Sequence, residues 1–397
     1  MDILTELEQT YHFTWQEKRQ LQEAEDDLAM WGKGHISRFL KLDEIAKASS
    51  GQQAKLVFRQ ILNGMEEERK KPTDYSDFHP AVQLQAKTKE TFASDDTLWG
   101  RCPCPTDGLE TRCCNLKTLD AVQGCSFGCS YCAVQSFYHQ GEVRFIKNLK
   151  ERLQTIQLPD EVWHIGTGQS SDSLLWGNEY GSIDALKSLA VRYPSKVIEL
   201  KTKSSRTDWI TTDWPRNIIA TWSLNAPVIQ QKEEHFTATI GQRLEAARKA
   251  ADHHILVGFH LHPMVYFEGY EEAYRNVVEA ITSCFSPEEV ILVSLGTLTF
   301  TKSVLKTLRA HHQPSRILDM ELVPFAGKFS YPYETKRSLF RTAYDAFPSS
   351  WKNGKPFFYL CFEDPDLWEP VFGHSYETNQ AFENAMQKSY LDTIYAH

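Results

Sequence analysis

The sequence lacks any long apolar segment. None of its uncharged apolar runs approaches the roughly 18 residues that a membrane-spanning helix requires. The opening residues, MDILTELEQTYHFTWQEKRQ, also lack the basic region and the apolar region of a secretory signal. We therefore expect a cytoplasmic protein that makes no contact with a membrane.

An excess of positive charge is also missing. The chain has 43 lysines and arginines against 52 aspartates and glutamates, which gives a net charge of -9. Proteins that bind nucleic acid generally have a basic face, so the composition does not favour that class. It does not exclude the class either, because a local basic channel can occur on an acidic protein.

The cysteine pattern excludes a disulfide framework. The chain has nine cysteines, an odd number, and seven of them lie between residues 102 and 132. Disulfide frameworks belong to secreted proteins with paired cysteines. Clustered cysteines in a reducing compartment more often bind metal or react.

Residues 1 to about 95 have the pattern of helices. The runs Glu17–Ala29 and Gln53–Glu68 carry apolar residues at helical spacing. No nucleotide-binding loop occurs here. We interpret residues 1–98 as a mostly helical N-terminal extension.

From Leu116 onward, short β-branched runs alternate with segments of helical periodicity. The predicted strands are Thr118–Gln123, Glu161–Ile165, Lys196–Lys201, Asn217–Ser223, His254–His260 and Val290–Leu295. The predicted helices are Asn148–Gln157, Ser182–Arg192, Arg243–Ala251, Glu271–Thr282 and Lys302–Ala310. This alternation predicts an α/β fold with a parallel sheet of right-handed βαβ units, and six units predict a partial (β/α)6 barrel. Functional residues are expected at the carboxyl ends of the strands.

The remaining chain is less regular. It contains a turn at Gly327–Lys328, a predicted helix at Lys336–Ala346 and an aromatic strand at Pro356–Phe362. We predict that the barrel spans residues 99–300, and that residues 301–397 form an α+β C-terminal extension that covers it.

Three cysteines follow the first predicted strand at close spacing, in the run Gly124-Cys125-Ser-Phe-Gly128-Cys129-Ser-Tyr131-Cys132. A [4Fe–4S] cluster is often held by four thiolates, so three thiolates would leave one iron open, which is typical of a catalytic site. Zinc is the alternative, with a fourth ligand from one of four other cysteines, and simple burial is another. Those four are Cys102, Cys104, Cys113 and Cys114.

The spacing Cys-x3-Cys-x2-Cys, with an aromatic residue before the last cysteine, resembles the radical S-adenosylmethionine (SAM) superfamily. Further segments narrow the resemblance to the spore photoproduct lyase-like family, over roughly residues 100 to 370. In order, with the cysteine segment first, they are GCSFGCSYCAVQSFY, HIGTGQSSDSL, IELKTKS, ATWSLN, RLEAARKAADHHILVGFHLHPMVYFEGYEEAY, ILVSLGTLTF and FFYLCFE.

This resemblance implies a barrel of the radical SAM type that binds a [4Fe–4S] cluster through Cys125, Cys129 and Cys132. It also implies reductive cleavage of SAM to a 5'-deoxyadenosyl radical, which abstracts hydrogen from damaged DNA or another nucleic-acid base. The class is a lyase-like DNA repair enzyme that receives electrons from a donor such as flavodoxin or ferredoxin. The protein supplies binding and orientation, and the cofactor carries the chemistry.

The resemblance also implies contacts to SAM at the strand ends. The Gly166-Thr167-Gly168 turn would meet the methionyl amine through its backbone, although an ordinary β–α turn explains the glycines equally. Lys203 would pair with the SAM carboxylate, and its alternative is a solvated lysine. Ser171 and Asp172 would bind amine or hydroxyl groups of SAM. Ser223 and Asn225 would bind its amino-acid moiety or its ribose. Tyr131 would pack against its adenine.

Two positions depart from spore photoproduct lyase proper. Gln169 stands where that enzyme has a hydrogen-donating cysteine, and Ala133 stands where a tyrosine is expected. Tyr138 or another cysteine is an alternative donor. No catalytic residue is therefore assigned, and repair of spore photoproduct is left open. His260 and His262 either line the barrel mouth or are satisfied within the barrel.

The cysteines outside the motif are left without an assigned role. Cys102, Cys104, Cys113 and Cys114 have the alternatives of a second metal site, a redox pair and inert thiols, and Cys361 is predicted to be buried. Two other classes of function compete with the enzyme: a non-catalytic iron–sulfur protein and a zinc-stabilised nucleic-acid-binding protein. Metal content and SAM cleavage would distinguish these classes.

Overall fold

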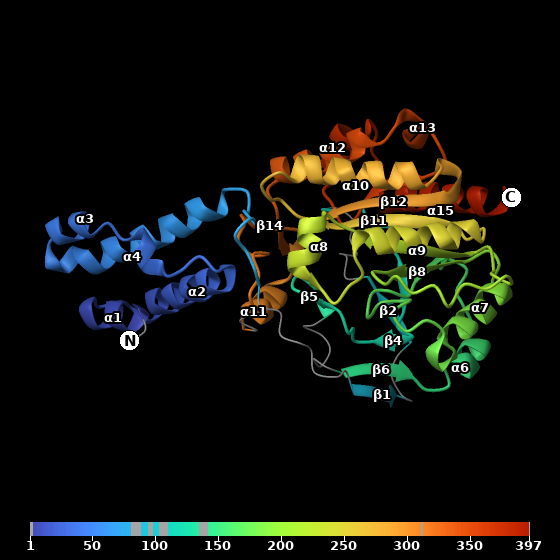
Figure 1. The fold of residues 1–397 in the computed structure, drawn as a ribbon, viewed down its shortest axis with the longest axis horizontal. Helices are drawn as coiled ribbons and strands as arrows, with labels where there is room; N and C mark the ends of the chain where they lie inside the picture. Colours follow the sequence, from blue (N-terminus) through green and yellow to red (C-terminus); the bar gives the residue numbers. More distant parts are fainter. Residues whose placement is uncertain are drawn as a thin grey trace. The chain divides into compact units, whose positions relative to one another are not determined.

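The computed structural model describes residues 3–80, 89–93, 98–102, 110–134, 142–310 and 313–396. The chain divides into two compact units, which are described separately (Figure 1). The first unit combines residues 1–83, 266–268 and 300–332, and the second combines residues 84–265, 269–299 and 333–397. No helix within the described residues is long and apolar enough to cross a membrane.

The first unit is mainly helical. Its helices include α1 (Ile3–Thr10), α2 (Trp15–Trp31), α3 (Leu42–Lys47), α4 (Ser50–Arg69) and α11 (Lys302–Ala310), and β14 (Val323–Phe325) pairs with β15 (Lys328–Ser330). Helix α2 begins at a capping box, in which the Thr14 N–H donates to the Glu17 carboxylate at 2.8 Å. The helix ends at Gly32, whose φ of 68° is left-handed.

Buried Asp27 links three of these helices. Its carboxylate accepts from Arg69 of α4 at 2.5 Å and from Arg309 of α11 at 2.8 Å. A buried carboxylate is costly without cationic partners, so this arrangement ties α11 to the N-terminal helices. Residues 300–332 accordingly group with the N-terminal helices, whereas the sequence predicted one extension over 301–397.

The second unit contains the predicted parallel sheet. Its eight strands have the order β16-β12-β11-β9-β8-β7-β3-β2. All the described pairings are parallel except β2 with β3. The strands are β2 (Trp99–Arg101), β3 (Lys117–Leu119), β7 (His164–Gly166), β8 (Val197–Thr202), β9 (Ile218–Leu224), β11 (Val257–Met264), β12 (Val290–Thr297) and β16 (Phe357–Leu360).

The six predicted strands correspond to β3, β7, β8, β9, β11 and β12, which are neighbours in this order. Helices follow the strands as predicted at α6 (Leu149–Thr155), α7 (Ser182–Arg192), α9 (Ile240–Asp252) and α10 (Tyr270–Cys284). A short helix after β9, α8 (Pro227–Glu233), was not predicted. Strands β9 and β12 are buried along their whole length, as expected for a parallel sheet covered on both faces. The α/β partial barrel is therefore confirmed.

The C-terminal part of this unit adds further helices and a strand. The helices are α12 (Tyr333–Ala346), α13 (Ser349–Lys352), α14 (Trp368–Phe372) and α15 (Asn379–Tyr395). Strand β16 pairs in parallel with β12. The predicted aromatic strand thus extends the main sheet beyond residue 300, which was the predicted end of the barrel.

The first predicted strand, Thr118–Gln123, is in fact two short strands. Strand β3 ends at Leu119, and β4 (Val122–Gln123) pairs with β6 (Glu142–Ile146), which in turn pairs with β1 (Lys89–Ala93). Between β3 and β4, the Ala121 N–H donates to the Leu119 carbonyl at 3.0 Å. This tight local bond turns the chain out of the main sheet.

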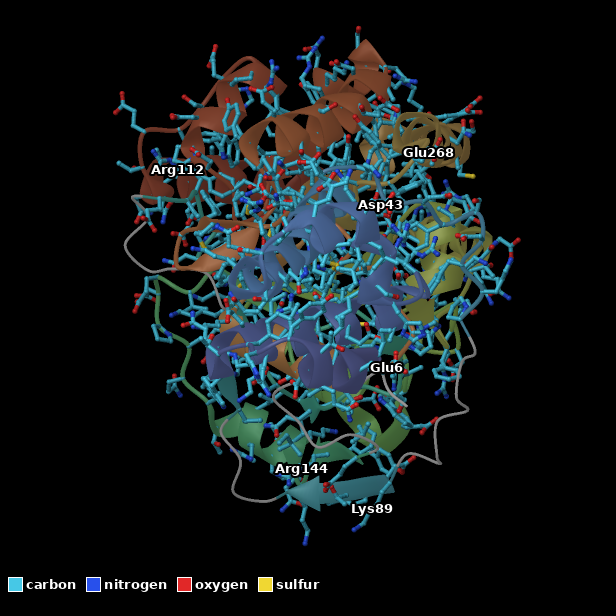
Figure 2. All side chains as sticks on the ribbon, turned by 90° about the vertical axis from the view of Figure 1, so that its left-hand side faces the viewer. Glu6, Asp43, Lys89, Arg112, Arg144 and Glu268 are labelled. Carbon is cyan, nitrogen blue, oxygen red and sulfur yellow. The ribbon has the colours of Figure 1, made fainter. Side chains whose placement is uncertain are left out.

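Main-chain contacts join the two ends of the sheet. Arg112, ahead of β3, forms an antiparallel bridge with Glu363, which follows β16. The Arg112 N–H donates to the Glu363 carbonyl at 3.1 Å, and its guanidinium, labelled in Figure 2, donates to the Tyr376 carbonyl at 2.7 Å. We call the segments 110–116 and 361–363, which this bridge joins, the seam. Because β3 and β16 lie toward opposite ends of the strand order, the seam links the two sides of the sheet.

Candidate functional site

The cysteine loop begins directly after β4 and is anchored to the chain that follows β7. Gly124 has a φ of 82°, and a Cβ there would lie 2.5 Å from the Glu142 carbonyl oxygen, so only glycine fits. The Gly124 N–H donates to the Ser170 carbonyl at 2.9 Å, and the Ser170 hydroxyl donates to the Val122 carbonyl at 2.8 Å. These bonds hold the start of the loop beside the chain that follows β7.

A second anchor holds the middle of the loop. Strand β5 (Gly128–Cys129) pairs with β10 (Glu234–His235) in an antiparallel arrangement. The Ser130 N–H also donates to the Glu233 carbonyl at 2.8 Å, and the Cys132 N–H donates to the Cys129 carbonyl at 3.0 Å. The loop therefore has a defined conformation over its three cysteines.

The three thiols influence one another. Cys129 is buried, whereas Cys125 and Cys132 are partly exposed. Burial raises the pKa of Cys129 to about 12, with Cys132 also raising it. Burial, Asp172 and the other two motif cysteines raise the pKa of Cys125 well above its ordinary value. The thiols can act as ligands only after they lose their protons, and a nearby positive charge stabilises the resulting thiolates. A bound metal supplies that charge, and a thiol that coordinates a metal is deprotonated outright.

The Cys125 sulfur also accepts a hydrogen bond from the Phe127 N–H at 3.4 Å. Within the described ranges, no three side chains of His, Cys, Asp or Glu converge to hold a single metal ion. A cuboidal [4Fe–4S] cluster does not require the three thiolates to converge on one ion, because each thiolate binds a separate iron.

Glu234 lies at the centre of a buried ionic network beside this loop. One carboxylate oxygen accepts from Arg243 at 2.6 Å, and the other accepts from Lys203 at 2.8 Å. Tyr131 and Asn225 donate to the second oxygen as well. Burial alone would raise the pKa of Glu234, but Lys203 and Arg243 outweigh burial and hold it well below its ordinary value.

The structure thus brings together three residues that the sequence predicted as SAM contacts. Tyr131, Lys203 and Asn225 share the Glu234 carboxylate. The Lys203 amine also donates to the Tyr131 hydroxyl and lies 4.9 Å from the centre of the tyrosine ring. Lys203 is therefore ion-paired within the protein rather than solvated.

The segment after β7 contains a satisfied carboxylate and an unsatisfied hydroxyl. Asp172 accepts from the Leu175 N–H at 2.8 Å, the Thr202 hydroxyl at 2.6 Å and the Lys203 N–H at 2.6 Å. The neighbouring Ser171 Oγ is buried without a hydrogen-bond partner among the described residues. Ser171 is thus the predicted contact whose side chain retains hydrogen-bonding capacity.

The Gly-Thr-Gly turn has a packing role in this structure. A Cβ on Gly166 would lie 2.9 Å from the Leu116 side chain, and one on Gly168 would lie 2.8 Å from the Lys201 carbonyl oxygen. The Thr167 N–H donates to the Glu199 carbonyl at 3.1 Å. Close approach between protein segments therefore explains both glycines.

The two predicted contacts near the end of β9 are also engaged by the protein. The Ser223 carbonyl accepts from Arg243 at 2.8 Å. The Asn225 amide donates to the Pro263 carbonyl at 2.9 Å, and its carbonyl accepts from the Tyr274 hydroxyl at 2.9 Å. Both residues therefore lie at the predicted strand end and help to position it.

A second buried carboxylate was not predicted. Glu199 on β8 accepts from Thr221 at 2.8 Å and bonds the ring nitrogens of His260 at 2.6 Å and His164 at 2.9 Å. Burial would raise the pKa of Glu199, but the two histidines lower it well below its ordinary value. A charged residue inside an apolar strand, as in Val-Ile-Glu-Leu, was the available signal.

Each histidine on β11 has one hydrogen-bond partner within the barrel, while the Nδ1 atom of His260 is buried without a partner among the described residues. His260 binds Glu199, and the His262 Nε2 lies 2.9 Å from the Ser294 hydroxyl. Burial, with a contribution from Lys201, lowers the pKa of His260 to about 4. Both rings belong to the interior of the sheet rather than to a site at its mouth.

Four of the cysteines outside the motif lie near one another at the seam and beside it: Cys102, Cys113, Cys114 and Cys361. The side-chain hydrogen bond with Cys113 is the largest cause that raises the pKa of Cys114, and burial and the charges of Cys113, Cys361 and Cys102 add to it. Cys361, which was predicted to be buried, is partly exposed. Cys284 is exposed at the end of α10. Cys104 and Tyr138 lie outside the described residues.

Comparisons with known proteins agree with this arrangement. The family model of spore photoproduct lyase matches residues 190–333. A spore photoproduct lyase mutant with bound AdoMet and dinucleoside spore photoproduct superposes with a TM-score of 0.55 at 18% identity, over 68% of this chain and 81% of that chain. Spore photoproduct lyase complexed with dinucleoside spore photoproduct superposes with a TM-score of 0.55 at 18% identity, over 68% of this chain and 82% of that chain. No curated protein matches the chain. The predicted resemblance and the fold are thus confirmed.

Proposed function

We propose that this chain is a radical SAM enzyme of the spore photoproduct lyase-like family. The family match over residues 190–333 supports this proposal, and so does the likeness in fold. The observation that carries it is the double anchoring of the cysteine loop. One anchor is the Gly124–Ser170 bond and the other is the pairing of β5 with β10.

The residues present fit a [4Fe–4S] cluster and SAM. Cys125, Cys129 and Cys132 are the thiols that would hold the cluster. Ser171, with its unsatisfied buried hydroxyl, is one polar group that would contact SAM. When bound, the cluster and SAM together supply a carbon-centred radical that abstracts hydrogen from the substrate.

The protein's own contribution is orientation. Glu234 fixes Tyr131, Lys203 and Asn225 beside the cysteine loop. Glu234 and Arg243 are fully buried, so their ion pair lies away from water, where electrostatic interactions are stronger. The remaining SAM contacts proposed from the family are Gly166, Thr167, Gly168, Asp172 and Ser223.

The proposed substrate is a damaged DNA base or another nucleic-acid base. The two matched structures contain dinucleoside spore photoproduct, which supports a substrate of this class. The proposed electron donor is a flavodoxin or a ferredoxin. The chain would thereby act as a lyase-like DNA repair enzyme.

We expect anaerobically reconstituted and reduced protein to convert SAM into 5'-deoxyadenosine but not to repair spore photoproduct efficiently. Gln169 and Ala133 replace the hydrogen-donating cysteine and the tyrosine expected from the family. An amide N–H bond is much stronger than a thiol S–H bond, so glutamine is a poor donor to a carbon radical.

The measurement is the amount of thymine dinucleoside released from dinucleoside spore photoproduct per 5'-deoxyadenosine formed. Failure to form any 5'-deoxyadenosine, in a preparation that holds iron, would contradict the proposed function. Stoichiometric repair would contradict only the prediction about the substrate. The double variant Gln169→Cys with Ala133→Tyr is the matching gain-of-function test.

Lys203→Ala is expected to weaken SAM binding by about tenfold or more while iron content is unchanged. A charge-assisted hydrogen bond to a carboxylate contributes roughly 1.5–3 kcal/mol, and Lys203 extends from the end of β8 toward the cysteine loop. Equilibrium titration with SAM provides the measurement. Exposed Lys150, replaced in the same way, is the control. Equal affinity in both variants would leave Lys203 with only its role as partner of Glu234.

A further inference from the structure

Lys201 is a cation inside the barrel that the proposed cofactor site does not use. It lies two positions after Glu199 on β8, so both side chains point to the same face of the sheet. That face also carries His260, because Glu199 and His260 are hydrogen-bonded to each other. The charge of Lys201 acts on both His260 and His262 and lowers the pKa of each ring. Lys201 therefore points into the interior of the sheet.

The Lys201 amine has no hydrogen-bond or ion-pair partner in the part of the chain that the structure describes. Its backbone N–H is bonded to Ser173 at 3.1 Å, but this bond leaves the amine unused. Its side chain is only partly exposed. Cationic groups away from bulk water are normally paired.

The neighbouring groups do not supply a counter-charge in direct contact. Glu199 is the nearest carboxylate on the strand, and three donors already occupy it: Thr221, His164 and His260. Cys361, at the seam, is held as a neutral thiol because burial of its sulfur raises the pKa of the thiol, with Cys102 adding to the effect. Lys203 is a second positive charge, and it is already paired with Glu234.

The surroundings also lower the pKa of Lys201 itself. Burial is the main cause, and Lys203 adds to it, while Cys361 and Glu199 oppose it. The interior therefore offers a cationic donor that no carboxylate among the described residues contacts directly.

We infer that the barrel interior binds an oxyanion of the substrate, of the phosphate or phosphodiester kind, and that Lys201 holds it. Lysine is a common phosphate-binding residue because its ammonium acts as a point charge. The anion would supply the partner that the described protein residues do not. That the anion belongs to the substrate of a radical reaction rests on the proposed function, whereas the anion site itself does not.

The test compares Lys201→Met with Lys201→Arg and with Lys150→Met, which replaces an exposed lysine of α6. The probes are the dinucleotide thymidylyl-thymidine, which carries one phosphodiester, neutral thymidine and inorganic phosphate. Each is titrated into the full-length protein, both reconstituted and iron-free. We expect Lys201→Met to weaken dinucleotide binding by about tenfold or more, and Lys201→Arg to retain most of it.

Two further readouts separate the sources of the anion. SAM also carries a carboxylate, so a loss of SAM affinity in Lys201→Met would assign Lys201 to the cofactor and overturn the inference. If the unmodified protein binds phosphate and the dinucleotide with equal affinity, the site recognises phosphate in general. If it binds the dinucleotide more strongly than phosphate and thymidine together, the site recognises a nucleotide. Equal dinucleotide affinity in Lys201→Met and Lys150→Met would also overturn the inference.

Thermal unfolding gives a measurement that needs neither iron nor activity. Removing a cation without a partner is expected to raise Tm in Lys201→Met, and the dinucleotide is expected to raise Tm in the unmodified protein but not in this variant. A lower Tm in Lys201→Met would show that the amine has a structural partner. Dinucleotide binding through Lys201 without formation of 5'-deoxyadenosine would retain this site while the proposed function fails.

Discussion

Replacing Cys129 with alanine is expected to abolish the brown iron–sulfur chromophore. Reconstituted protein should contain about four irons per chain, and the variant should lose most of them. Cys129 is the buried member of the three thiols, and the pairing of β5 with β10 holds its backbone in place. A ligand in a rigid, buried position cannot be replaced by rearrangement of the loop.

Iron and zinc analysis of anaerobically purified protein provides the measurement. Cys284→Ala is the matched control, because this cysteine is exposed at the end of α10. Cys125→Ala tests the same expectation at a partly exposed thiol, where misfolding is less of a concern. One equivalent of zinc without iron, or full iron content in Cys129→Ala, would refute the assignment of the cluster.

The strands of the barrel could be predicted because their signal is local. Strands β9 and β12 are mostly apolar runs of seven and eight residues, and β8 begins with the apolar pair Val197-Ile198. The break between β3 and β4 could not be predicted in this way, because it depends on a single tight bond from Ala121 to Leu119. The pairing of β16 with β12 joins segments that are distant in sequence, and periodicity carries no information about such partners.

The same difference between local and distant information applies to the site. The three cysteines and Gly124 are visible in one short segment, and their anchoring at the strand ends follows from the order of elements. Arg243 illustrates what the sequence hides. It lies on the same helix as Arg248 in RLEAARKAAD, yet Arg243 is fully buried against Glu234 while Arg248 is partly exposed. Only the packing of α9 against β9 and β11 distinguishes them.

Glu234→Gln is expected to destabilise the protein by about 3–5 kcal/mol, because it leaves a buried cation without its counter-charge. Arg243 is fully buried, and Glu234 is the only carboxylate with which it forms an ion pair among the described residues. Its remaining acceptors are neutral: the carbonyls of Ala238 at 2.9 Å and Ser223 at 2.8 Å, and the Thr237 hydroxyl at 2.7 Å. These bonds satisfy the guanidinium N–H groups but do not neutralise its charge.

Chemical unfolding at neutral pH provides the measurement, with exposed Glu245→Gln on α9 as the control. The double variant Glu234→Gln with Arg243→Met should recover part of the loss, because it removes both buried charges. A Glu234→Gln variant as stable as the control would show that the network contributes nothing to folding.

The effect of Glu234→Gln should also depend on pH in a defined direction. The folded protein holds the pKa of Glu234 well below its ordinary value, because Lys203 and Arg243 outweigh burial. The stabilisation is therefore fully present above the unfolded pKa of about 4.3 and is lost as pH falls toward the folded pKa. Glutamine does not titrate, so the difference in stability between the two proteins should shrink below about pH 4. A difference that stays constant from neutral pH into this range would mean that ionisation of the Glu234 carboxylate is not the source of the stabilisation.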